Sequence, residues 1–269
     1  MFSIRQAVPA LFAVALATVP AAAQGPMEIV VNVPAGRLDV FENGARVRSY
    51  PVSVGTPRHA TPTRQASIRR MVWNPSWTPP DAAWARDEKP AAPGWGNPMG
   101  RVKMHLFDDY YVHGTPARNE RFLGRPASHG CIRMRNADVM ELAQLVLRAD
   151  GGAAVSDETV QRLVNNPRAT RELALAGRVR VRVEYRLAEA DAESVTLHPD
   201  VYARARGQYL TRVQQDLRTA GADATAAVEH LAVAGIPSAA VRLPRAPMPA
   251  LLPAPSMSLS AVAFHAGLR

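Results

Sequence analysis

The chain of 269 residues carries 32 Lys and Arg against 23 Asp and Glu, a formal net charge of +9, and 47% of its residues are hydrophobic. This length and apolar fraction exclude a wholly disordered chain and predict one or two domains. The single cysteine excludes an internal disulfide framework and every zinc module with several cysteine ligands.

The positive charge does not identify a nucleic-acid partner. The basic residues are scattered, and the sequence has neither a glycine-rich phosphate loop nor a zinc finger. Diffuse basic charge attracts polyanions in general, including acidic cell-wall polymers and membrane surfaces. A general preference for arginine explains it equally well, because all basic residues except Lys89 and Lys103 are arginine.

The N-terminus predicts export. Residues 7–19 are almost continuously apolar, follow the lone charge of Arg5, and precede Ala21-Ala22-Ala23, which has the A-x-A form of a secretory cleavage site. The apolar stretch is shorter than the roughly 20 residues of a transmembrane helix. We expect residues 1–23 to be a signal peptide and the mature protein to lie outside the cytoplasm without a transmembrane segment.

Two regions of period-two alternation predict β-structure at the start of the mature chain. Residues 28–55 alternate apolar and polar side chains around Asn43-Gly44, a strong signal for a two-residue hairpin turn. Residues 101–106 alternate in the same way, turn at Asp108-Asp109, and continue as a strand over 110–113. The first part of the protein is therefore expected to be mainly β.

Residues 73–98 differ from the strands on either side. This segment holds all four tryptophans and is rich in proline, so we expect a long ordered loop rather than a regular element. Loops of this length inside a compact domain are usually functional. We expect the rings either to cover a reactive centre, or to pack against the edge of a sheet.

Helical periodicity begins after the cysteine. Asn136 is placed to cap a helix that runs to about Leu147, and a second helix is expected from Ser156 to Asn166-Pro167. A strand with alternating valine and arginine follows at 179–187, and an amphipathic helix is expected over 200–219. We expect a mixed strand and helix extension over 151–236 and a disordered Pro/Ala-rich tail over 237–269.

The chemistry is concentrated in residues 111–115 and 128–134, which read YVHGT and SHGCIRM. Cysteine is strongly nucleophilic once a neighbouring histidine removes its proton, and a preceding glycine lets backbone amides point at the attacked carbonyl. Two alternatives remain at this point. Cys131 is a small buried hydrophobe, or it forms a zinc site with His113 and His129, although no fourth ligand stands at a suitable spacing.

The two motifs resemble the signature of the L,D-transpeptidase catalytic domain, a family of enzymes that cross-link bacterial peptidoglycan. Flanking segments agree in order with its Gram-negative periplasmic branch, among them Thr61-Pro62-Thr63, Trp77-Thr78-Pro79-Pro80 and Asn97-Pro98-Met99-Gly100. The resemblance covers about residues 27–150. It implies a mainly β (α+β), sandwich-like catalytic domain over 24–150 with a few helices, and a periplasmic location.

Carried over position by position, the resemblance implies a role for each residue of the motifs. Cys131 is the nucleophile, His113 is the general base, and the Gly114 carbonyl orients the imidazole. The amides of Gly130 and Cys131 bind the oxyanion, and His129 has a supporting role near the thiolate. The residues expected to bind substrate are Ser128, Arg133, Tyr111, Trp77 and Trp95. Neither a metal nor another cofactor is implied.

The reaction implied by the resemblance proceeds through a thioester. The thiolate attacks the carbonyl between the L-centre of the third stem residue, usually diaminopimelate, and the terminal D-alanine, which leaves. An amine then takes the acyl group and gives a 3-3 cross-link, a lipoprotein attached to the wall, or an exchanged D-amino acid. The alternatives are an L,D-carboxypeptidase, in which water takes the acyl group, and a non-catalytic peptidoglycan-binding protein of the same fold.

Overall fold

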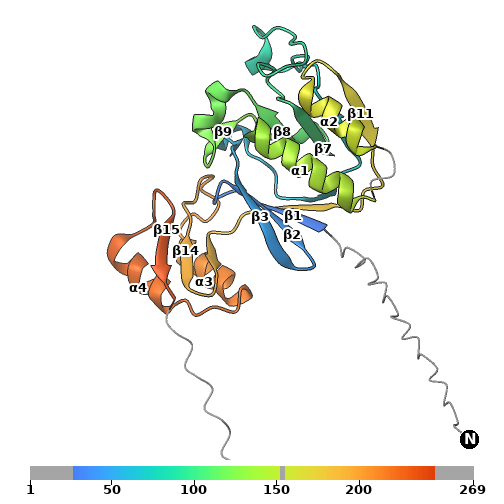
Figure 1. The fold of residues 1–269 in the computed structure, drawn as a ribbon. Coiled ribbons are helices and arrows are strands. Elements are labelled where there is room, and N and C mark those ends of the chain that lie inside the picture. Colours follow the sequence, from blue (N-terminus) through green and yellow to red (C-terminus); the bar gives the residue numbers. More distant parts are fainter. Residues whose placement is uncertain (1–26, 152–154, 246–269) are drawn as a thin grey trace, which may run out of the picture. The chain divides into compact units, whose positions relative to one another are not determined.

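The computed structural model describes residues 27–151 and 155–245, which form two compact units divided between Tyr185 and Arg186 (Figure 1). The predicted signal peptide and residues 246–269 of the predicted tail lie outside the described residues. Within the described ranges, no helix is long and apolar enough to span a membrane.

The first sheet of the first unit has the strand order β3-β2-β1-β12-β5. Its strands are β1 (Met27–Asn32), β2 (Arg37–Glu42), β3 (Ala45–Pro51), β5 (Gln65–Ser67) and β12 (Arg180–Glu184). Asn43 and Gly44 join β2 to β3 with φ angles of 52° and 80°. Two successive positive φ angles define the tight hairpin turn that Asn-Gly favours, so the predicted hairpin is confirmed.

The second sheet carries the motif residues and has the order β10-β8-β7-β6-β11. Its strands are β6 (Arg70–Trp73), β7 (Val102–Phe107), β8 (Tyr110–Thr115), β10 (Ile132–Arg135) and β11 (Arg171–Ala174). The predicted turn at Asp108-Asp109 joins β7 to β8. Two short strands, β4 (Val54–Gly55) and β9 (Pro126–Ser128), form a separate parallel pair.

Strand alternation gives the second sheet one apolar and one polar face. Ile132, Val112 and Met104 lie side by side in the register, continue through Met71 and Leu173, and are buried. Helix α1 (Asn136–Ala149) lies against β7, β8 and β10, and its buried side chains include Val139, Leu142, Ala143 and Val146 (Figure 1). The next row, Arg133, His113 and Lys103, therefore points to the opposite face.

The first unit extends beyond the boundary expected at residue 150. Helix α2 (Asp157–Asn165), strand β11 and strand β12 all belong to it. β12 pairs in parallel with β1 and antiparallel with β5, so it lies inside the first sheet rather than in an extension. Its predicted alternation is confirmed, because Val181 and Val183 are buried whereas Arg180 is exposed.

The second unit contains a three-stranded sheet and two helices. The strands are β13 (Ala188–Ala190), β14 (Ser194–Leu197) and β15 (Val241–Pro244), and the helices are α3 (Tyr209–Thr219) and α4 (Thr225–Ala234). The described residues also include short 3-10 helices at Pro57–His59, Ala83–Ala85 and Ala117–Phe122. The prediction of a mainly β fold with a few helices is confirmed.

Two predictions in the second unit are wrong in part. The helix expected over 200–219 begins only at Tyr209, because the Asp200 carboxylate accepts the backbone amides of Arg204 and Ala205 at 2.9 and 2.8 Å and holds a non-helical loop. Residues 241–244, expected to be disordered, pair as β15 with β14. Arg242 reinforces this strand by donating to Ser194 Oγ at 2.7 Å.

Candidate active site

Cys131 and His113 come from neighbouring parallel strands. His113 lies opposite Arg133 in the pairing of β8 with β10, and Cys131 is the residue immediately before β10. The thiol is partly exposed and donates to the Asp109 carbonyl at 3.5 Å, whereas His113 is only 3% exposed. The nucleophile candidate is thus only partly accessible, and it lies immediately before the strand that pairs with the strand of the buried base candidate.

The Gly114 carbonyl fixes the orientation of the His113 ring. Its oxygen lies 2.6 Å from Nδ1. Because a carbonyl oxygen only accepts hydrogen bonds, Nδ1 carries the proton and Nε2 of the neutral ring keeps a lone pair. Burial, followed by the positive charge of Arg133, lowers the pKa of His113 to about 3. The imidazole is therefore neutral at physiological pH and able to accept a proton at Nε2.

Close backbone packing supports this orientation. A Cβ on Gly114 would overlap Asn136 Oδ1 and come within 3.1 Å of the Gly100 Cα, so this strand position accepts only glycine without rearrangement. Asn136 Oδ1 accepts the Arg101 amide at 2.8 Å, and Asn136 Nδ2 donates to the Thr115 carbonyl at 3.1 Å. The predicted N-cap role of Asn136 is therefore wrong, since its side chain ties β8 to the start of β7.

A network of hydrogen bonds shapes the loop before the cysteine. Ser128 Oγ donates to the Cys131 carbonyl at 2.5 Å and accepts the Gly130 amide at 3.0 Å. Thr61 Oγ1 donates to the Gly130 carbonyl at 2.7 Å. Gly130 has a φ of +113°, and a Cβ there would lie 2.7 Å from the ring of Tyr110. The loop therefore requires glycine before the nucleophile.

This network bears on two expectations. Ser128 is 1% exposed and holds the loop, so it is not placed to bind substrate. The Gly130 amide already donates to Ser128 Oγ at 3.0 Å, so an oxyanion at this amide would compete with that hydrogen bond. In both cases the polar group is already used inside the short turn from residue 128 to residue 131, where Ser128 Oγ bonds to the Cys131 carbonyl and to the Gly130 amide.

The surroundings of the thiol oppose its ionisation more than they favour it. Burial raises the pKa of Cys131, and the hydrogen bond from the Tyr111 amide and the charges of Arg133 and Lys103 counteract this only in part. Because Arg133 and Lys103 also act on His113, the two candidate catalytic groups share one positively charged environment. The resting pair consists of a protonated thiol and a neutral imidazole.

His129 faces the tryptophan-rich loop. Its ring stacks on Trp84 with centroids 4.0 Å apart and planes 4° apart, and it lies edge-on to His59 at 5.0 Å. Burial, followed by the charge of His59, lowers the pKa of His129. The ring therefore packs against the tryptophan-rich loop, and neither Trp84 nor His59 was predicted as its partner.

The other aromatic candidates lie apart from this stack. Trp77 pairs with Ala91 through two backbone hydrogen bonds of 2.9 Å, which close the loop on itself. Trp95 is 55% exposed and lies 4.5 Å from the Arg101 guanidinium carbon. Tyr111 is half-buried, and Lys103 Nζ lies 5.4 Å from the centre of its ring.

Lys103 is a site residue that the sequence analysis missed. It lies directly opposite His113 in the β7–β8 pairing, half-buried on the polar face of the sheet. The alternation over 101–106 was a usable signal, because it places residue 103 opposite in phase to the buried Val102 and Met104. Among the described residues, no group of three or more His, Cys, Asp or Glu side chains is arranged to hold a metal ion.

The comparison with protein families decides the identity of this domain. The family model YkuD, described as the L,D-transpeptidase catalytic domain, matches residues 26–169. The chain belongs to this family. The L,D-transpeptidase domain thus includes both motifs, the tryptophan-rich loop and helix α2, and reaches past the limit that the sequence analysis set at residue 150.

Individual relatives agree with the family match. The chain is 39% identical over 105 residues to the L,D-transpeptidase in the ATP synthase subunits region of Fuscovulum blasticum, covering 38% of this chain and 54% of the relative. It is 32% identical over 122 residues to L,D-transpeptidase YkuD of Bacillus subtilis, covering 45% and 61%. YbiS of Escherichia coli is 29% identical over 195 residues, covering 64% and 61%. The chain therefore spans little more than half the length of these relatives.

Solved structures with some likeness carry the same family name. The L,D-transpeptidase of Mycobacterium smegmatis is 17% identical with a TM-score of 0.35, covering 59% of this chain and 58% of that chain. The catalytic domain of the E. faecium L,D-transpeptidase is 13% identical with a TM-score of 0.38, covering 59% and 96%. Likeness at these TM-scores supports no detail of the site, which rests on the chain's own geometry.

Proposed function

We propose that the chain is an L,D-transpeptidase that acts on peptidoglycan stem peptides through a thioester on Cys131. The observation that carries this proposal is the arrangement of a partly exposed thiol beside a buried, neutral imidazole whose Nδ1 is held by the Gly114 carbonyl. Family membership supports the reaction class. The proposal includes export to the periplasm, where the wall polymer lies, and the predicted signal peptide supports this location.

Each residue of the proposed site has a role in one step of acyl transfer. His113 Nε2 takes the thiol proton as sulfur bonds to the carbonyl carbon, and the Cys131 amide donates to the developing oxyanion. The C–N bond then breaks, and the imidazolium returns the proton to the departing D-alanine. In the second half, an amine attacks the thioester and the thiolate leaves, with His113 moving the second proton.

The positive face of the sheet is the donor-binding surface in this proposal. Arg133 and Lys103 flank His113 in one row, and Tyr111 lies beside Lys103. These cations suit the carboxylates of a stem peptide. Trp77 and Trp95 are proposed to contact the remainder of the donor, and the acceptor is a diaminopimelate amine, a D-amino acid or a lipoprotein lysine.

The proposal is tested by incubating the mature chain with a tetrapeptide stem and a diaminopimelate acceptor. We expect release of D-alanine and a 3-3 linked product by mass spectrometry, and loss of both in Cys131→Ala. Release with only the trimmed tripeptide as product would indicate the L,D-carboxypeptidase. Peptide binding without release of D-alanine by the native chain would indicate a non-catalytic wall-binding protein.

The pKa shifts predict how the thiol reacts with pH. Burial lowers the pKa of His113 to about 3 and raises the pKa of Cys131, so the resting pair is a neutral imidazole and a protonated thiol, and the thiolate fraction grows with pH. The rate of alkylation by iodoacetamide is expected to rise about tenfold per pH unit between pH 6 and 8. Cys131 is the only thiol, so the rate reports on it alone. A rate that stays constant over this range would contradict the assigned protonation states.

Lys103 is expected to select donors with a free carboxylate. Replacing Lys103 with glutamine should raise KM about tenfold for a stem peptide whose diaminopimelate carboxylate is free, because a charged hydrogen bond is lost, with little change for the amidated peptide. Lys103→Arg should restore the low KM. The exposed Lys89 offers a matched control, and Lys89→Gln should leave both values unchanged. Equal effects of Lys103→Gln on both donors would rule out this selection.

A further inference from the structure

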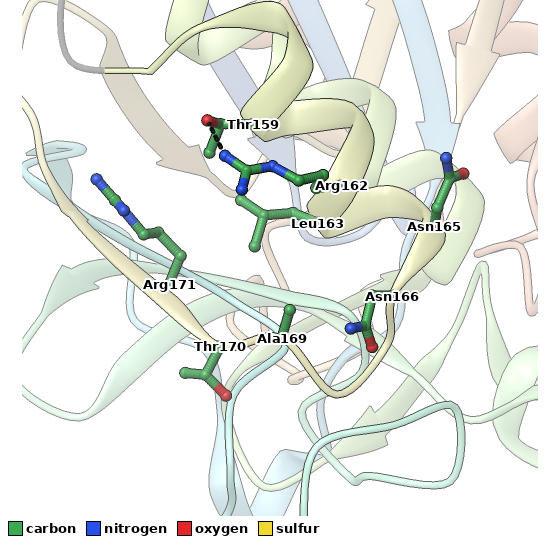
Figure 2. Close-up of a pocket in the computed structure, with 8 residues that line it drawn as sticks. All are labelled: Thr159, Arg162, Leu163, Asn165, Asn166, Ala169, Thr170 and Arg171. Atoms are coloured by element: carbon green, nitrogen blue, oxygen red, sulfur yellow. Dashed lines mark hydrogen bonds between the residues drawn. The ribbon is translucent and has the colours of Figure 1, made fainter.

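A cavity of about 500 Å³ lies beside α2, away from the cysteine. Its lining residues are Thr159, Arg162, Leu163, Asn165, Asn166, Ala169, Thr170 and Arg171. Figure 2 shows α2 on one side and the segment leading into β11 on the other, with Leu163 and Ala169 pointing into the space between them. β11 and β10 are opposite edges of the second sheet, so the cavity lies roughly 19 Å from the thiol across four strand spacings.

The lining of this cavity is positively charged. It contains two arginines and no carboxylate. Arg162 donates to Thr159 Oγ1 at 2.9 Å, as Figure 2 shows, and both guanidinium groups are exposed. Within the described ranges, neither Arg162 nor Arg171 lies within ion-pair distance of an acidic side chain. Both charges are therefore available to a ligand.

A third arginine lies behind the wall of the cavity. Arg101 is fully buried and donates to the carbonyls of Leu163 and Val164 at 2.8 and 2.9 Å, while its Nη1 has no hydrogen-bond partner among the described residues. Asn74 Nδ2 donates to the carbonyls of Leu163, Asn166 and Ala169 at 2.7 to 3.0 Å.

These bonds change the electrostatics of the helix end. The last carbonyls of a helix carry partial negative charge and repel anions. Here the carbonyls that face the cavity wall already accept from Arg101 and Asn74, and the donor that supplies two of these bonds carries a full positive charge. The end of α2 is therefore compatible with an anion, which is unusual for a helix C-terminus.

We propose that this cavity is a second binding site for a carboxylate-bearing stem peptide, an inference that rests on the proposed function. Cavities of about 300–1,000 Å³ hold ligands of several residues, so this one is larger than a single inorganic anion needs. The half-buried Ala169 offers apolar surface to an alanine methyl group, and the exposed Arg162 and Arg171 offer donors to a terminal carboxylate. A peptide bound there lies too far from Cys131 to react, so the site retains the polymer rather than the reacting donor.

The test uses the full chain carrying Cys131→Ala, which prevents turnover. Calorimetric titration with a tetrapeptide stem is compared between this parent and a variant that also carries Arg162→Gln and Arg171→Gln. Arg168→Gln is the matched control, because Arg168 is exposed on the same segment and does not line the cavity. The peptide with amidated carboxylates and inorganic phosphate serve as the comparison ligands.

We expect the double variant to lose a charge-dependent binding step, with affinity for that step falling roughly tenfold or more, and the control to retain it. The amidated peptide should lack this step with every protein. Unchanged binding by the double variant, or phosphate binding as tightly as the peptide, would overturn the proposal. In chains that keep Cys131, D-alanine release should be the same with and without Arg162→Gln and Arg171→Gln. Absence of D-alanine release from the native chain would contradict the proposed function instead.

Discussion

Replacing His113 with asparagine is expected to lower kcat for D-alanine release by about 10³-fold with little change in KM. In the proposed mechanism His113 accepts the thiol proton, which moves only during the reaction, and the Gly114 carbonyl holds Nδ1 so that Nε2 is the accepting atom. The residual rate should rise with pH, because thiolate that forms without the base attacks directly. A merely structural role would give no such recovery in alkaline solution.

The measurement is a steady-state assay of D-alanine from pH 6 to 9, with thermal unfolding as the check on folding. His230→Asn is the matched control, since His230 lies on α4 in the second unit and has no part in the proposed site. It should retain the native rate. A His113→Asn variant that is folded and retains a rate within about threefold of native, against the 10²–10⁴-fold expected of a general base, would exclude that role.

Gly100→Ala is expected to cost about 3–4 kcal/mol of unfolding free energy. Gly100 has a φ of +63°, and a Cβ there would lie 2.5 Å from the Gly114 Cα and would also overlap Asn136 Oδ1. The atoms that must move are backbone, so no side-chain rotation relieves the overlap. Because Gly114 holds His113, activity should fall together with stability.

Urea unfolding measures this cost, and Gly44→Ala separates its two causes. Gly44 has a comparable φ of +80°, but a Cβ there meets no atom within 4 Å. The control should therefore lose only the conformational part, about 1 kcal/mol. Equal losses in the two variants would mean that the contact between Gly100 and Gly114 contributes nothing.

Local patterns in the sequence predicted the local structure well. The turns at Asn43-Gly44 and Asp108-Asp109, and helices α1 and α2, depend on neighbouring residues, and each was predicted close to its observed place. The Gly114 carbonyl contact was implied by the family resemblance, and it too joins adjacent residues. What these features share is that all their determinants lie within a few residues of one another.

Features that depend on distant parts of the chain were missed. The alternation of β12 reads the same whether the strand lies in an extension or inside the first sheet, and only its pairing with β1 decides. His129 lies two residues before the nucleophile in sequence, yet its ring stacks on Trp84, which is supplied by a remote loop. Ser128 was predicted to bind substrate because the sequence does not show that its hydroxyl forms hydrogen bonds within its own turn.

The formation of the thioester on Cys131 is tested most directly by the intact mass of the protein. The chain is mixed with a tetrapeptide stem without an acceptor, quenched in acid, and analysed by mass spectrometry. We expect an added mass equal to that of the donor minus D-alanine, present in the native protein and absent from Cys131→Ala. Release of D-alanine by a Cys131→Ala variant, or an adduct that persists in it, would show that Cys131 is not the nucleophile.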